Sequence, residues 1–467
     1  MHVTRAIPSP VETEATRPIP WLLFLGLSVA FFIALHDPMR SFSIGEDYLP
    51  SADTLQRHAA EGNTKRQVGF LLVGAIGALI LLGSNRRPLE MRGILAALII
   101  FFMIWITLSI TWADQRALTG RRLVVIAMLA IGALAVVTRL SLREIVLLVF
   151  LSSLAYLLIG IAAELALGTF RPSAERYRFA GTIHPNNQGV NCSLIILSGI
   201  TAALTERRFR RLFAAGVLFA CVFLVLTKSR TSLLSCGVAF AFLSALVFGR
   251  SRHVPFIFCA CMTLLLGVVI FARDSLASLF TNTVLLGRTD QDISGALTLT
   301  GRLPLWQNLL EYAARRPIQG YGYGSFFTVE HIREISARQG WPIAECHSVF
   351  LEVLLGLGVV GVSAYALIQF LGLARTVSYF RITDDPRYAM LGSLLLLGIV
   401  GGMAESTLLV PTMQTFVQFL TLAQLAFLAP SPEIAALLQS RARGKFSAPT
   451  IYPFPARLPS PVPAGKS

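Results

Sequence analysis

A long polar segment between two apolar runs carries residue types that can bind an anion and move a proton. Arg302 lies at an expected helix start within this segment, and His347 lies where the next apolar run begins. A guanidinium can pair with two phosphate oxygens at once, and a neutral imidazole can accept a proton from a hydroxyl. Together they predict a site that handles a lipid-linked anion at the mouth of a bundle of membrane spans.

His347 is the strongest single candidate for a catalytic residue. It immediately precedes an apolar helix, whose positive N-terminal end disfavours imidazolium, so we expect a neutral ring that can act as a general base. The alternative is a capping or interfacial histidine. Two acids inside or beside spans, Glu352 and Glu405, are further candidates, because ionisable groups there are usually functional. Either could pair with an arginine or bind acceptor hydroxyls.

A second polar segment precedes the apolar run at 190–204 and ends in His184-Pro-Asn186-Asn187. Amide side chains offer both donors and acceptors, so Asn186 and Asn187, with His184 beside them, can bind sugar hydroxyls. The alternative is a Pro-Asn turn followed by a helix cap.

A third polar segment, at 227–232, is very short and contains Lys228 and Arg230. We expect Thr231 or Ser232 to cap the following helix, with Arg230 reinforcing an anion site at its start. The alternative for Arg230 is an arginine that reaches lipid phosphates.

The glycine run Gly320-Tyr-Gly322-Tyr-Gly324 lacks the Lys-Ser/Thr and the preceding strand of a nucleotide-binding loop. We interpret it as a tight turn that lets the backbone approach a ligand closely. Asp290-x-Asp292 could hold a divalent ion, but no second acidic cluster is expected beside it. We therefore predict no metal and no cofactor, with arginine neutralising the anion.

The composition indicates which elements must position these residues. Hydrophobic residues make up 54% of the 467 residues and charged residues only 14%, which is typical of a polytopic α-helical membrane protein. The net charge of +15 lies in short clusters between apolar runs, so it indicates topology signals and lipid contacts rather than nucleic acid.

The fold class predicted is an all-α bundle of about twelve spans. Short basic loops alternate with less basic ones, which places both termini in the cytoplasm and the loop at 273–348 on the outer face. We divide the chain into a tail (1–18), a membrane domain (19–429) and a disordered tail (430–467). In the outer loop we expect two helices, at 300–316 and at 325–338. The first should lie on the bilayer through one apolar side formed by Leu305, Trp306, Leu309 and Leu310. The expected spans are 21–35, 68–83, 93–112, 123–138, 145–163, 190–204, 212–226, 232–249, 254–272, 349–373, 389–404 and 413–428.

The ordered set of these motifs, with the long outer loop, resembles the O-antigen ligase and polysaccharide polymerase superfamily. The resemblance covers spans six to eleven well and the first five by general plan. Its motifs are Gly181…His184-Pro-Asn186, Ser229-Arg230-Thr231, Gly301-Arg302…Trp306, Gly320-x-Gly322-x-Gly-Ser-Phe and His347-Ser-x-Phe-Leu…Gly358-x-x-Gly361. Two positions depart from the family pattern: Ser348 replaces the usual Asn, and Gly356 stands where Glu is frequent, so no role transfers to that position.

The resemblance implies a twelve-span, metal-independent inverting glycosyltransferase that uses an undecaprenyl-diphosphate-linked glycan. Arg230 and Arg302 would contact the diphosphate, and His347 would be the base. The acceptor stays open between a growing glycan, lipid A–core and a protein hydroxyl. The expected location is the bacterial inner membrane, with the site at the periplasmic face. The rival hypothesis is a twelve-span transporter or flippase, whose long loop would instead fall inside, between spans six and seven.

Overall fold

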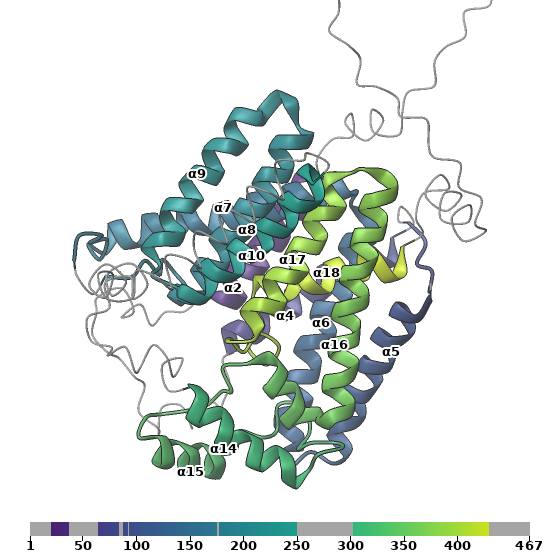
Figure 1. Ribbon diagram of the computed structural model, residues 1–467, viewed down its shortest axis with the longest axis vertical. Helices are drawn as coiled ribbons and strands as arrows, with labels where there is room; N and C mark the ends of the chain where they lie inside the picture. The colour runs from purple at the N-terminus through teal and green to yellow at the C-terminus, as the bar shows by residue number, and fades with distance from the viewer. Residues whose placement is uncertain are drawn as a thin grey trace, which may run out of the picture. The chain divides into compact units, whose positions relative to one another are not determined.

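The computed structural model describes residues 20–36, 64–83, 87–91, 93–174, 177–249 and 302–428. Within these ranges the regular structure is helical, apart from one isolated β-bridge between Leu89 and Leu428. Both predicted tails, the span predicted at 254–272 and Asp290-x-Asp292 lie outside the described residues. The all-α fold class is confirmed for the part of the chain that is described (Figure 1).

Eight helices in these ranges are long and apolar enough to cross a membrane. Two shorter apolar helices, α2 (Trp21–Leu35) and α17 (Pro386–Gly402), and the polar-faced α18 (Met413–Phe427) complete the bundle. Each coincides with a predicted span, whereas the count of twelve stays a prediction. The eight are α4 (Thr64–Leu82), α5 (Gly93–Leu108, extended by η2, Ser109–Thr111), α6 (Arg116–Arg139), α7 (Leu142–Ala166), α8 (Pro185–Thr205), α9 (Arg210–Leu226, preceded by η3, Arg207–Phe209), α10 (Arg230–Phe248) and α16 (Val349–Thr383).

Helix α8 lies at the centre of the packing. It contacts α7, α9, α10 and α17, while α16 contacts α5, α14 and α17. In its apolar window 72% of α8 is buried, against 22% for α9, so α9 presents most of its surface outward. Helix α8 is therefore covered by its neighbours along most of its length, as expected for a helix in the middle of a bundle. Its first turn lies at one end of the bundle.

Helix α16 is broken at Gly358, whose φ of 67° and ψ of −168° are open almost only to glycine. A break in a helix frees backbone groups, which need partners inside a membrane protein. Here the glycine run and its neighbours supply them: Tyr321 N donates to Leu355 O (2.8 Å), Gly322 N donates to Gly356 O (2.9 Å), and Val359 N donates to Pro317 O (2.7 Å).

Two helices of the polar segment, α14 (Arg302–Arg315) and α15 (Val329–Gln339), form close to where the sequence predicts them. Gly340 ends α15 in the left-handed conformation. Of the side chains of α14 expected to face the bilayer, Leu305 and Leu309 do not. Both are fully buried in an aromatic cluster with Tyr312, Tyr321, Phe326 and Ile332. Trp306 is partly buried against this cluster, whereas Leu310 is 50% exposed, so contact with the bilayer stays a prediction for Leu310. The cluster fixes α14 to α15 and to the start of α16 (Figure 1).

Candidate active site

The first turn of α8 is built as a helix cap. His184 is the N-cap residue, and its Nδ1 accepts a hydrogen bond from Asn186 N at 3.2 Å. Pro185 fits the first helical position, because its missing N–H would have no partner there. The cap interpretation of this motif is therefore confirmed, and a role in binding sugar stays a prediction for His184 and Asn187. Asn186 lies one residue inside the helix, where its side chain is free to turn toward other elements.

A buried carboxylate on α7 holds the segment that leads into this turn. Glu164 accepts backbone hydrogen bonds from Ala180 N (3.0 Å) and Gly181 N (2.7 Å) and a third from the Tyr177 hydroxyl (2.5 Å). The same segment carries Arg178. One donor precedes Arg178 in the sequence and two follow it. Glu164 therefore holds the chain on both sides of Arg178.

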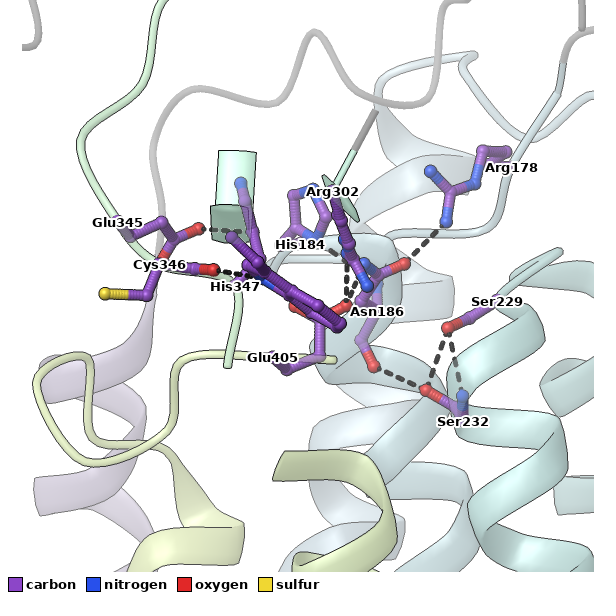
Figure 2. Close-up of polar contacts among 11 residues, drawn as sticks. Arg178, His184, Asn186, Ser229, Ser232, Arg302, Glu345, Cys346, His347 and Glu405 are labelled. Atoms are coloured by element: carbon purple, nitrogen blue, oxygen red, sulfur yellow. Dashed lines mark hydrogen bonds and ion pairs between the residues drawn. The ribbon is translucent and has the colours of Figure 1, made fainter. Parts of the chain in front are cut away.

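Four side chains from four segments form a connected chain of polar contacts (Figure 2). Arg178 donates to Asn186 Oδ1 at 2.8 Å, and Asn186 donates from Nδ2 to Glu405 Oε1 at 2.9 Å. The same carboxylate oxygen pairs with Arg302 at 3.1 Å. Glu405 follows α17 and Arg302 opens α14, so the chain joins residues far apart in the sequence. Burial raises the pKa of Glu405 above its ordinary value, and Arg302 opposes that rise.

The start of α10 lies beside this chain. Arg178 also donates from Nε to Thr227 O at 3.0 Å, and the Ser232 hydroxyl donates to Asn186 O at 3.0 Å. The expected cap is wrong: Ser229 is the N-cap residue, and its side chain accepts from Ser232 N. Arg230 is thus the first helical residue, and its charge repels that of Arg302.

His347 lies at the edge of the same group of residues (Figure 2). It precedes the N-cap residue Ser348 of α16 and has a φ of 50°. Such a conformation costs a residue other than glycine about 1–3 kcal/mol and is frequent at functional sites. The ring stacks on Trp341 with centroids 5.9 Å apart. Glu345 Oε1 lies 3.3 Å from its Nδ1 without the geometry of a hydrogen bond.

The electrostatics of His347 agree with the neutral ring predicted from its sequence position. Burial is the larger effect and the positive charge of Arg302 the second, and together they lower the pKa of His347 to about 4. The contribution expected from the helix end stays a prediction. At neutral pH the ring therefore carries one proton and can accept a second.

The two glycines predicted to approach a ligand approach the protein instead. A Cβ on Gly320 would collide with the backbone of α16 at Gly356, and one on Gly322 would collide with Ala113. Both have positive φ. The run is thus needed for close packing against the break in α16, and its substrate-binding role stays untested.

Glu352 lies one turn into α16 and is buried. Its carboxylate accepts from the backbone N–H of Leu409. It therefore contacts the segment that carries Glu405, and does not join the chain of contacts that contains Arg302. Lys228, with a φ of 49°, forms the turn between α9 and α10.

Sequence reasoning missed three residues of this site as candidates: Glu345, Arg178 and Trp341. Arg178 stands among other arginines of its segment, so its type alone did not single it out. Glu345 was not among the candidates, although a carboxylate two residues before a candidate base was a usable signal. In the described ranges, no three or more His, Cys, Asp and Glu residues come together as a metal site.

Comparisons with known proteins show what this chain is similar to. Residues 215–366 match the family model described as O-Antigen ligase, a stretch that includes Arg230, Arg302 and His347. The chain is also 25% identical over 347 residues to the exopolysaccharide production protein ExoQ of Rhizobium meliloti (strain 1021), covering 66% of this chain and 72% of that protein. The resemblance to the O-antigen ligase and polysaccharide polymerase superfamily is therefore confirmed.

Proposed function

We propose that the protein is a membrane glycosyltransferase of surface polysaccharide biosynthesis, a ligase or a polymerase. It would move a glycan from undecaprenyl diphosphate to an acceptor hydroxyl at the periplasmic face of the inner membrane. The observation that carries the proposal is that Arg302, held by Glu405 at 3.1 Å, and the neutral ring of His347 lie in one group of residues at one end of the bundle, beside the start of α10 (Figure 2). Anion binding and proton removal are the two tasks of such a transfer.

In the proposed step, Arg230 and Arg302 bind the diphosphate of the donor. His347 takes the proton of the acceptor hydroxyl, and the acceptor oxygen attacks the anomeric carbon as the carbon–oxygen bond to the diphosphate breaks. The electron pair of that bond leaves on undecaprenyl diphosphate, where the arginines stabilise the developing charge. The attack from the opposite face inverts the anomeric carbon. No metal takes part in this scheme.

Glu405 has a preparatory role in the proposal. Before the donor binds, its carboxylate holds Arg302 at 3.1 Å and Asn186 at 2.9 Å, so the guanidinium is already oriented. A preorganised cation costs less to place around a charged leaving group than a mobile one. Asn186, held on its other side by Arg178, would present its remaining amide hydrogen to the donor or the acceptor.

Two acceptors are compatible with the comparisons, because one relative is named for exopolysaccharide production and the matching family for O-antigen ligation. A growing glycan as acceptor makes the protein a polymerase, and lipid A–core makes it a ligase. The chemistry at His347 is the same for both.

The test is deletion of the gene from the source organism, with the wild-type gene or His347→Ala restored. The polyprenyl-diphosphate pool is then extracted and its sugars are sized. Long glycans stranded on the carrier indicate a ligase, and single repeat units indicate a polymerase. We expect His347→Ala to resemble the deletion at a protein level equal to that of the wild type. A pool unchanged by the deletion would refute the proposal.

A further inference from the structure

Resting on the function proposed above, we infer that Glu345 is the positioning residue of the base: it orients Nδ1 of His347 and stabilises the imidazolium formed during transfer. No role for this residue follows from the family resemblance, whose motif begins at the histidine. The inference depends on geometry at three points: the approach of the carboxylate, the burial of one ring nitrogen and the fixed plane of the ring.

The two ring nitrogens of His347 have different surroundings. Nδ1 is buried, lacks a hydrogen-bond partner in the resting structure and faces Glu345 Oε1 at 3.3 Å. The side chain as a whole is 21% exposed, so its accessible part lies elsewhere on the ring. Stacking on Trp341 limits how the ring can turn. Nε2 is therefore the nitrogen that can reach the hydroxyl of the acceptor substrate, while Nδ1 faces the carboxylate of Glu345.

The charged groups that face Glu345 come from five segments. His347 lies on its own segment, Glu405 follows α17, Arg302 opens α14, and Arg66 belongs to α4. The buried carboxyl group of Glu352, on α16, also interacts electrostatically with Glu345. Burial is the largest effect and Glu405 the second, and they raise the pKa of Glu345 to about 7, while the two arginines oppose the rise. The Glu345 side chain is 36% exposed, so its carboxyl group is in contact with solvent and can respond to the pH of the medium.

This arrangement determines where the proton and the electron pairs go during the proposed step. The acceptor hydroxyl gives its proton to Nε2, its oxygen bonds to the anomeric carbon, and the diphosphate leaves with the electron pair of the broken bond. The ring becomes imidazolium, whose Nδ1–H then faces the carboxylate of Glu345. An ionised Glu345 stabilises that cation, whereas a protonated one does not. Transfer by the wild type should therefore rise as the pH passes upward through about 7, the region where Glu345 ionises.

The experiment measures initial rates of transfer by purified wild-type protein and the variants Glu345→Gln, Glu345→Ala and His347→Ala between about pH 5.5 and 8.5. The donor is the lipid-linked glycan extracted from the deletion strain, and membranes of that strain supply the acceptor. For Glu345→Ala we expect kcat to fall about 10- to 100-fold with KM for the donor nearly unchanged, the range seen when a partner that orients a functional histidine is removed. Glu345→Gln, which keeps an acceptor for Nδ1–H, should retain more activity and lose the rise near pH 7.

Glu330→Gln is the matched control, because Glu330 is an exposed carboxylate of the same polar segment, on α15. It should leave both rate and pH profile as in the wild type, and thermal unfolding of each variant in detergent reports whether it is folded. A Glu345→Gln protein with the wild-type rate and the wild-type pH profile would overturn the inference alone. Absence of transfer by the wild type itself would instead overturn the proposed function.

Discussion

At the scale of single residues, the site combines an arginine held by a carboxylate with a histidine that is kept neutral by its surroundings. Arg302 pairs with Glu405, yet it still repels Arg230 and lowers the pKa of His347. The charge of Arg302 thus serves two purposes. It would bind a diphosphate, and it also keeps His347 neutral and able to accept a proton. Removing that charge should weaken both.

Arg302→Ala and Arg230→Ala should each lower kcat about 10²- to 10³-fold, the cost of deleting one group that stabilises a developing anion. The measurement is transfer from the extracted lipid-linked glycan by purified protein. Arg333→Ala, at an exposed arginine of α15, is the matched control and should transfer normally. Undiminished transfer by Arg230→Ala would remove that residue from the proposed mechanism.

At the scale of elements, the site depends on the interruption of helix α16 at Gly358. The apolar run that begins after His347 was predicted as one span, but α16 departs from helical geometry at Gly358. The glycine run pairs with the exposed backbone at the break, and the aromatic cluster attaches α14 to the start of α16. Through these contacts the segments that carry Arg302 and His347 are held to the same helix end.

Gly358→Ala should destabilise the protein by about 1–3 kcal/mol or more, because alanine strongly disfavours this φ and its Cβ would meet the carbonyl of Ile318. A lower Tm of the detergent-solubilised protein would report the loss. Gly237→Ala, on helix α10, is the matched control, because a Cβ added there would have no neighbouring atom within 4 Å. An equal Tm for Gly358→Ala and wild type would contradict the break described here.

At the scale of the whole molecule, the described helices form a multi-pass bundle with the candidate site at the ends of α8, α10 and α16. The positive-inside rule predicts that this end faces outward, because the basic loops Arg139–Arg143 and 205–211 lie at the other ends of these or neighbouring helices. Arg143 and Glu206 form an ion pair with a shortest distance of 2.5 Å, which joins two of those loops.

The orientation predicts which positions a reagent in the periplasm can reach. Arg333→Cys, on α15, should react with a membrane-impermeant maleimide in cells with a permeabilised outer membrane. Arg208→Cys, on η3, should react only after the inner membrane is opened. Both positions are exposed in the structure. The wild type supplies the background from native cysteines, and the reverse pattern of labelling would show that the predicted topology is inverted.

The sequence by itself determined the class of the fold, the helix positions and the residue types of the site. Apolar runs of membrane length and the helix-capping motifs are local signals, so α2, α8 and α16 begin at or within a few residues of their predicted starts. His347, Arg230 and Arg302 stood out for the same reason: their chemistry is unusual for their local surroundings.

Only the tertiary structure decided which of these residues meet. The bond from Asn186 to Glu405 joins positions 219 residues apart, and no local pattern encodes such a pairing. The same holds for the glycine run, which packs against the break in α16, and for Leu305, which is buried by α15 and α16. The protonation of His347 likewise follows from burial and from Arg302, both of which exist only once the chain has folded.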